Sequence, residues 1–319
     1  MTSDGERANM APEYRIHWLN TGWIESMPGV SLMGEGRHPG VPGGQITSYG
    51  WSSDVRRPDG RVVSGTMIPA PAWYIEAGDK KILVDTGTGN AQEVIDVQRL
   101  YGDALATVTE PEHDIVYQLA ELGVAPEDID IVVQTHLHFD HVGSNEAFTN
   151  ATFLVNAQEL PWALCPPPYG VYYYREFSHH VRAVLDQIHP VHGSYQVAPG
   201  IRMVHTGGHS PGHSVVFVET AVGTAVLAGD AVYNYRNLEY EWPQGPVFDV
   251  AATLQSMQTL KTADVILLNH DPLIQDLFPG GVIGAEALPA ATADYMARLR
   301  TSGAFPLAQF NPDTNPVRA

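Results

Sequence analysis

Short hydrophobic runs separated by polar and glycine-containing segments occupy most of the chain, a pattern typical of strands joined by turns. Two β-rich runs, residues 72–76 and 81–85, flank a four-residue segment that contains Gly78, and together they predict a hairpin. Residues 112–122 place apolar side chains at helical intervals, and Gly123 suits the end of that helix. The central chain therefore predicts mixed α and β structure.

The two ends of the chain are different in character. Residues 1–13 are polar, and we expect a disordered tail. Residues 14–66 combine short apolar stretches with many glycines and prolines, which favours strand pieces joined by long loops. Residues 284–300 predict a closing helix followed by a polar tail. We therefore predict one domain over residues 14–319.

One pattern repeats in the central chain: an apolar run of the β type ends, and histidine or aspartate residues follow directly. The runs are residues 129–133, 201–204, 224–227 and 265–268, and the clusters that follow them are residues 135–141, 205–213, 229–230 and 269–271. Strand ends in a layered α/β sheet converge on one edge. These clusters are therefore predicted to meet in space.

Composition narrows the classes of function. The 319 residues are 44% hydrophobic, enough for a large core, and 36 acidic against 17 basic residues give a formal charge of −19. This charge repels phosphate backbones and anionic lipids, so neither nucleic acid nor a membrane is expected as a partner. The first residues lack the pattern of a secretory signal, and Cys165 is the one cysteine, so a cytoplasmic location without disulfides is expected.

The strongest chemical signal is the sequence His136-Leu137-His138-Phe139-Asp140-His141. Histidines at positions i and i+2 of an extended loop direct two imidazoles to one side, which suits one metal ion. Asp140 and His141 can turn the other way and serve a second ion. Neutral imidazole and carboxylate groups are zinc ligands, and catalytic zinc sites leave one position for water. The alternative, a solvated histidine-rich loop, is disfavoured by the clusters downstream.

This motif resembles the HxHxDH motif of the metallo-β-lactamase superfamily, and the resemblance extends over residues 70–277. It implies an α/β fold, a four-layer αββα sandwich, with two zinc ions. The later segments HSPGH, AGD and NHD complete the ligand set. By this resemblance, one zinc takes His136, His138 and His213, the other takes Asp140, His141 and His270, and Asp230 bridges both. Asp85, in the segment LVDTG, matches a carboxylate that supports such sites.

Within the superfamily, the chain is most similar to N-acyl-homoserine lactonases, through residues 126–155, the segment HSPGHSVVFVET and the segment GDAVY. Tyr233 lies three residues after Asp230, where those lactonases place a tyrosine that contacts the substrate carbonyl. The chain differs from them in its N-terminal region and in the insert at residues 165–180. Both lie where substrate-binding loops could be, and we expect a lid insert around residues 161–190.

The resemblance implies a dinuclear zinc hydrolase that opens a lactone or ester, with N-acyl-homoserine lactone as the best-supported substrate, a quorum-quenching reaction. Zinc-bound hydroxide would attack a carbonyl polarised by zinc and by Tyr233, and Asp140 would pass the proton to the leaving group. A thioesterase of the glyoxalase II kind, another carboxylic ester hydrolase and a non-catalytic binding module remain as alternatives. The partner expected is a small molecule, and a homodimer is a possible assembly.

Several further residues have two interpretations. His205 and His209 lie beside His213, but the PGH spacing favours His213 as the ligand. His179 and His180 are interpreted as a polar helix face. The aromatic residues of the insert either line a substrate pocket or form an ordinary lid surface; they are Trp162, Tyr169, Tyr172, Tyr173 and Tyr174.

Overall fold

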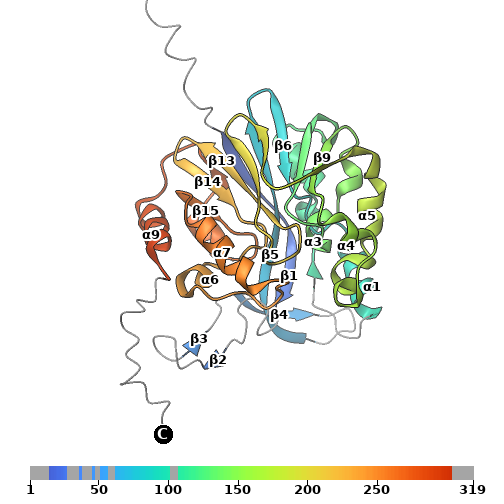
Figure 1. Ribbon diagram of the computed structural model, residues 1–319, viewed down its shortest axis with the longest axis horizontal. Helices are drawn as coiled ribbons and strands as arrows, with labels where there is room; N and C mark the ends of the chain where they lie inside the picture. Colours follow the sequence, from blue (N-terminus) through green and yellow to red (C-terminus); the bar gives the residue numbers. More distant parts are fainter. Residues whose placement is uncertain are drawn as a thin grey trace, which may run out of the picture.

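Two stacked β-sheets with helices on their outer faces make up the computed structural model (Figure 1). It describes residues 14–26, 36–37, 45–46, 51–56, 62–100 and 107–303. The predicted tail at residues 1–13 and the polar segment after residue 303 lie outside this part of the chain.

The larger sheet has nine strands in the described residues. They are β1 (Arg15–Ser26), β4 (Trp51–Arg56), β5 (Val62–Ala77), β6 (Lys80–Val84), β7 (Thr107–Val108), β8 (Ile131–Gln134), β9 (Thr152–Asn156), β10 (Ile188–Val191) and β16 (Val282–Ile283). The order is β10-β9-β8-β6-β5-β1-β16, with β4 on β5 and β7 on β1. The predicted hairpin is confirmed, since β5 and β6 pair antiparallel with Ala77 opposite Lys80.

The smaller sheet supplies the other inner face of the sandwich. Its strands, in spatial as well as chain order, are β11 (Tyr195–Ala198), β12 (Ile201–His205), β13 (Ser214–Thr220), β14 (Gly223–Leu227) and β15 (Val265–Leu267). The short strands β2 (Gly36–Arg37) and β3 (Gln45–Ile46) pair separately. All four predicted runs before the histidine and aspartate clusters are strands, with ends that differ by at most two residues.

The helices are α1 (Ala91–Leu100), α2 (Ile115–Glu121), α3 (Phe139–Val142), α4 (Leu160–Leu164), α5 (Ser178–Ala183), α6 (Tyr235–Tyr240), α7 (Val250–Leu260), α8 (Ile274–Leu277) and α9 (Ala290–Thr301). Helix α2 begins three residues later than predicted, at Ile115, because a 3-10 turn occupies Pro111–His113 and the Asp114 side chain accepts bonds from the backbone N–H groups of Val116 and Tyr117. The closing helix begins later than predicted, at Ala290, directly after Pro289. No helix of the described residues is long and apolar enough to cross a bilayer.

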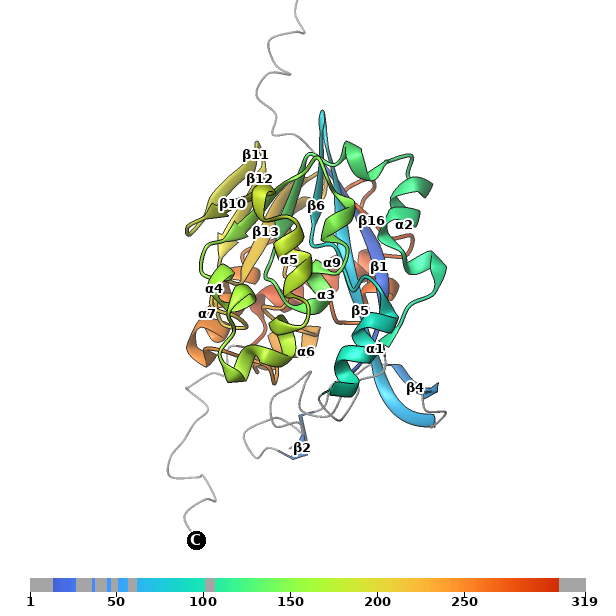
Figure 2. The same ribbon diagram turned by 90° about the vertical axis from the view of Figure 1, so that its right-hand side faces the viewer.

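Successive side chains of the larger sheet point alternately into two apolar layers, one on each face of the sheet. Trp73 and Ile75 of β5 pack toward the smaller sheet, in a cluster that continues through β13–β15 to α7 and α9. Ala72 and Tyr74 point the other way, into a cluster with side chains of α2, α4 and α5. Figures 1 and 2 show the same order of helix, sheet, sheet and helix. The predicted αββα sandwich is confirmed.

The carboxyl ends of four strands lie at one edge of the sandwich. Asp85 follows β6, His136 follows β8, Asp230 follows β14 and His270 follows β15. Two hydrogen bonds join the sheets there: Ser214 N–H donates to the Thr135 carbonyl (2.8 Å), and Trp73 Nε1 donates to Asn269 Oδ1 (2.9 Å). The predicted convergence of the polar clusters is confirmed.

Tyr74 gives the fold a test at alkaline pH. Burial, together with the charges of Glu76 and Asp128, raises its pKa to about 12. The unfolded chain loses this proton near pH 10, so the stability linked to it is complete below about pH 10 and is lost as the pH rises toward 12. We expect wild type to lose more free energy of unfolding than Tyr74→Phe between about pH 8 and about pH 12 in urea titrations. Tyr117→Phe, at a half-exposed tyrosine of α2, is the control and should lose as much as wild type. Equal losses in wild type and Tyr74→Phe would contradict the assignment.

Candidate metal centre

The edge where the strands end gathers buried imidazole and carboxylate groups from both sheets. His136 and His138 lie on the loop after β8, and Asp140 and His141 lie on the short helix α3, which begins directly after His138. All seven predicted ligands are buried: His136, His138, Asp140, His141, His213, Asp230 and His270.

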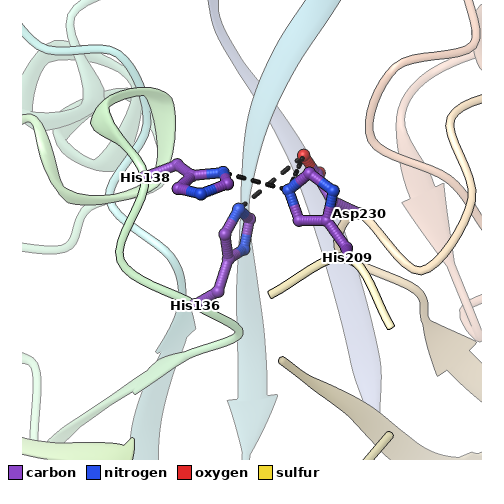
Figure 3. A group of neighbouring side chains, drawn as sticks. All are labelled: His136, His138, His209 and Asp230. Atoms are coloured by element: carbon purple, nitrogen blue, oxygen red, sulfur yellow. Dashed lines mark hydrogen bonds and ion pairs between the residues drawn. The ribbon is translucent and has the colours of Figure 1, made fainter. Parts of the chain in front are cut away.

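The first group consists of His136, His138, His209 and Asp230, which point toward one another (Figure 3). One ligand atom from each lies within 4.8 Å of all the others. Asp230 Oδ2 is 3.7 Å from His136 Nε2 and 3.3 Å from His209 Nε2. His209 Nε2 is also 3.0 Å from His138 Nδ1. Three imidazole nitrogens and one carboxylate oxygen therefore surround one position.

The second group consists of Asp140, His141 and His270. Asp140 Oδ2 is 3.6 Å from His141 Nε2 and 3.5 Å from His270 Nε2. The other oxygen of Asp230, Oδ1, is 3.3 Å from His141 Nε2 and 3.1 Å from His270 Nε2. Asp230 thus faces the first group with one oxygen and the second group with the other, as the bridging prediction requires.

The structure brings His209, rather than the predicted His213, together with the first group. Both ring nitrogens of His213 are occupied: Nδ1 lies 2.9 Å from Thr206 Oγ1, and Nε2 accepts the backbone N–H of Asp230 at 2.9 Å. His209 instead donates from Nδ1 to the Pro246 carbonyl (2.9 Å), which leaves Nε2 directed at Asp230. His213 therefore positions the backbone of Asp230, while His209 completes the first group.

His213 directly precedes β13, whereas His209 lies further back on the loop that connects β12 to β13. The sequence does not show which ring has a nitrogen left for a metal, because the bonds of the ring nitrogens depend on how this loop is folded.

Asp85 fixes the positions of His141 and, through Thr135, of His136 by hydrogen bonds. It accepts hydrogen bonds from the backbone N–H and Oγ1 of Thr135 (both 2.8 Å) and from His141 Nδ1 (2.8 Å). Thr135 Oγ1 in turn lies 3.1 Å from His136 Nδ1. These bonds keep a proton on Nδ1 of both histidines and leave Nε2 as the electron-pair donor. The backbone of Asp85 has φ +61°, a strained conformation that the surrounding bonds maintain.

The donor set fits metal ions because buried ligand atoms lack other partners. Among the described residues, His136 Nε2, His141 Nε2 and Asp230 Oδ1 are buried and have no hydrogen-bond partner. Burial and the neighbouring histidines lower the pKa of His136 well below its usual value, so its ring is neutral. Burial works against ionisation of Asp230, but the histidines outweigh it and hold its pKa well below the usual range. An ionised carboxylate buried beside the neutral ring of His136 is a site that a cation stabilises.

Tyr233 lies at the same edge, where the sequence placed it. Its buried ring centre is 4.8 Å from that of His270 and 5.8 Å from that of His209. Burial, followed by the charge of Asp230, raises the pKa of its hydroxyl well above 10. The hydroxyl therefore keeps its proton at neutral pH and can donate a hydrogen bond.

Glu159 is a buried residue of the site that sequence reasoning missed. Its carboxylate accepts from the backbone N–H of Leu137 (3.3 Å) and of Gly212 (2.7 Å), and from the hydroxyls of Ser210 and Tyr174. It thereby joins both histidine loops to the aromatic insert. No local pattern marks this glutamate in the sequence; its role follows from burial alone.

Aromatic side chains of the insert border the first group. Tyr173 stacks on His138 with ring centres 4.8 Å apart, and Tyr174 meets the same ring edge-on at 4.6 Å. Trp162 packs edge-on against Phe248 at 5.2 Å. These side chains line a small pocket beside His138 and His209, together with Gly170, Ser210, Pro211 and Pro246. The side chains of Tyr169 and Tyr172 are outside the described part.

The fold, together with the two neighbouring groups of metal-ligand side chains, is that of a metal-dependent hydrolase. A sequence profile described as "Metallo-beta-lactamase superfamily" matches residues 65–270. The chain belongs to the metallo-β-lactamase superfamily.

Two curated relatives are lactonases. N-acyl homoserine lactonase AiiA of Bacillus thuringiensis subsp. kurstaki is 34% identical over 221 residues, which cover 65% of this chain and 84% of that protein. N-acyl homoserine lactonase AttM of Rhizobium radiobacter is 29% identical over 223 residues, covering 64% and 82%.

Solved structures that are similar to this chain also include lactonases. An N-acyl homoserine lactone hydrolase with the product N-hexanoyl-L-homoserine bound at its catalytic metal centre has a TM-score of 0.63 and 26% identity, covering 84% of this chain and 96% of that chain. The dizinc quorum-quenching lactonase AidC, at 15% identity and a TM-score of 0.56 over 88% of this chain and 93% of that chain, shares the fold.

The exchanged roles of His209 and His213 can be tested by metal analysis. We expect His209→Asn to lose about one of two bound ions, because the first group loses a nitrogen donor. His213→Asn should keep both ions after loading with excess zinc and should instead lower the thermal unfolding midpoint. Elemental analysis of both variants and wild type, loaded in parallel and gel-filtered, measures this. Two ions in His209→Asn and one in His213→Asn would reverse the assignment.

Proposed function

We propose that this protein is a dinuclear zinc hydrolase that opens the lactone ring of N-acyl-homoserine lactones. The observation that carries the proposal is the position of Asp230 between two histidine groups, with the Tyr233 hydroxyl at the same edge. The 34% identity to a lactonase over 65% of this chain supports the same substrate class.

The proposed ligands divide into two sets that share Asp230. The first ion takes His136, His138, His209 and Asp230, and the second takes Asp140, His141, His270 and Asp230. Nitrogen and carboxylate oxygen donors without sulfur suit zinc. Zinc in these positions would supply hydroxide near neutral pH and polarise the substrate carbonyl.

The chain's own groups complete the chemistry. Tyr233 is protonated and donates to the carbonyl oxygen as negative charge develops on it, which stabilises the transition state more than the ground state. One carboxylate oxygen of Asp140 lies near both His141 and His270. It would take the proton of the attacking hydroxide and pass it to the ring oxygen, which leaves as an alkoxide when its bond to the carbonyl carbon breaks. Backbone bonds to His213 and from Gln244 Nε2 (2.8 Å) fix Asp230 during the reaction.

The pocket beside His138 favours an acyl chain over a charged thiol conjugate. Trp162, Tyr173 and Phe248 give it apolar walls. The described residues that line it include no lysine or arginine, which a glutathione thioester would need for its carboxylates. The space among these side chains, about 10 Å³, is too small for an acyl chain, so we propose that the chain lies against their outer surface while the lactone ring lies over the metal centre.

The substrate class is tested by one panel of assays. Zinc-loaded protein is given N-acyl-homoserine lactones of several chain lengths, aryl esters, and thioesters including one of glutathione. We expect the highest kcat/KM on the lactones, with the ring-opened acid identified by mass spectrometry, and loss of activity on chelation. Asp230→Asn serves as the inactive control. A higher kcat/KM on the glutathione thioester would contradict the proposal and favour the thioesterase alternative.

Tyr233→Phe tests the direct role of the hydroxyl while keeping the ring. We expect kcat on the best lactone to fall roughly 10-fold, less than for a lone oxyanion donor because zinc polarises the same oxygen. KM should change little and both ions should remain. An unchanged kcat with full metal content would make Tyr233 a packing residue.

A further inference from the structure

A second cluster of metal-ligand side chains lies apart from the seven residues of the centre. Glu93 of α1 faces His179 and His180 of α5, and one ligand atom of each lies within 4.8 Å of the others. His179 Nε2 is 2.9 Å from Glu93 Oε1, and His180 Nε2 is 3.3 Å from Glu93 Oε2. The sequence predicted a polar helix face here, which is wrong for His180, because its side chain is only 8% exposed.

The hydrogen bonds of His180 leave its second nitrogen without a proton in the neutral ring. Its Nδ1 lies 2.8 and 2.9 Å from the two carboxylate oxygens of Glu146, so Nδ1 carries the proton and donates it. Nε2 then offers a lone pair to another carboxylate, that of Glu93. Two acceptors facing each other at 3.3 Å repel unless a positive charge lies between them, either a metal cation or a second proton on His180. Burial lowers the pKa of His180, but Glu146 and Glu93 outweigh it and raise that pKa, so this position attracts positive charge.

His179 repeats the arrangement. Its Nδ1 lies 3.0 Å from the backbone carbonyl of Glu176, so the proton of the neutral ring is again on Nδ1 and Nε2 again faces Glu93. The two rings have centres 4.0 Å apart. Protonating both would place two positive charges in contact, whereas one divalent cation would satisfy both lone pairs and the carboxylate together.

We propose that Glu93, His179 and His180 bind a third divalent cation, of the class that accepts imidazole and carboxylate, such as zinc. Ligands at the usual zinc bond lengths of about 2.0–2.2 Å lie roughly 3.3 Å from one another, close to the separations seen here. Glu146 holds the His180 ring through its far nitrogen, the usual support for a ligating histidine. Water completes the coordination on the side of His179, whose side chain is 53% exposed.

This cation would link helix α5, which continues the aromatic insert, to helix α1. Helix α5 follows the turn that carries Tyr173 and Tyr174, and Phe177 packs against Phe139 of the metal loop with ring centres 5.2 Å apart. Linking α5 to α1 therefore restrains the segment that borders the first histidine group. The inference does not depend on which ester the protein hydrolyses.

The test uses the full-length protein with its dinuclear centre already filled with zinc. Further Zn²⁺ is titrated by calorimetry and the bound metal is counted by elemental analysis. We expect one additional equivalent in wild type and none in Glu93→Gln or in His179→Asn. His192→Asn, at an exposed histidine outside the cluster, is the matched control and should bind the additional ion.

Thermal unfolding gives a second readout that does not rely on activity. Excess Zn²⁺ should raise the unfolding midpoint of wild type and of His192→Asn, since a ligand that binds only the native state stabilises it. The midpoints of Glu93→Gln and His179→Asn should not respond. The proposal is overturned if wild type binds no further equivalent, or if Glu93→Gln and His179→Asn bind it as wild type does.

Discussion

The site depends on the contacts that the Asp230 carboxylate makes with histidines on both of its sides. This carboxylate is buried, ionised and shared by two histidine groups that come from both sheets, with Oδ2 facing one group and Oδ1 the other. A buried charge of this kind is costly unless cations compensate it, so folding at this edge and metal binding are coupled. His213 accepts the backbone N–H of Asp230 and Gln244 donates to its carbonyl, so the backbone of Asp230 is held in position between the two groups.

Strand-end reasoning predicted most of this centre because it uses a property of the backbone: parallel and mixed sheets bring the residues after their strands to a common edge. His136, Asp230 and His270 were found in this way, and the structure brings them together. The sequence does not distinguish His209 from His213, because both imidazoles occupy one short loop and only their hydrogen bonds show which ring faces the first group. Motif spacing carries no information about those bonds.

Residues whose roles depend on burial were beyond the sequence for a related reason. Glu159 has no partner pattern along the chain, since its four donors come from three separate segments. His180 could not be separated from a surface histidine, because the glutamates that surround it come from α1 and from the short 3-10 turn Asn145–Ala147. Local periodicity reports which face of a helix is polar, but it does not report which tertiary neighbour covers that face.

The four bonds of Glu159 have a consequence for the divergence of substrate preference. A hydrolase changes its substrate most readily by altering loops that are mechanically independent of the reacting centre. Here the aromatic insert and both histidine loops donate hydrogen bonds to the one carboxylate of Glu159. A substitution that shifts Tyr174 therefore also disturbs the loops that carry His138 and His209. Mutations in this insert should therefore combine non-additively with mutations in the metal loops, and new specificities should be reached more readily through the wall that Phe248 provides.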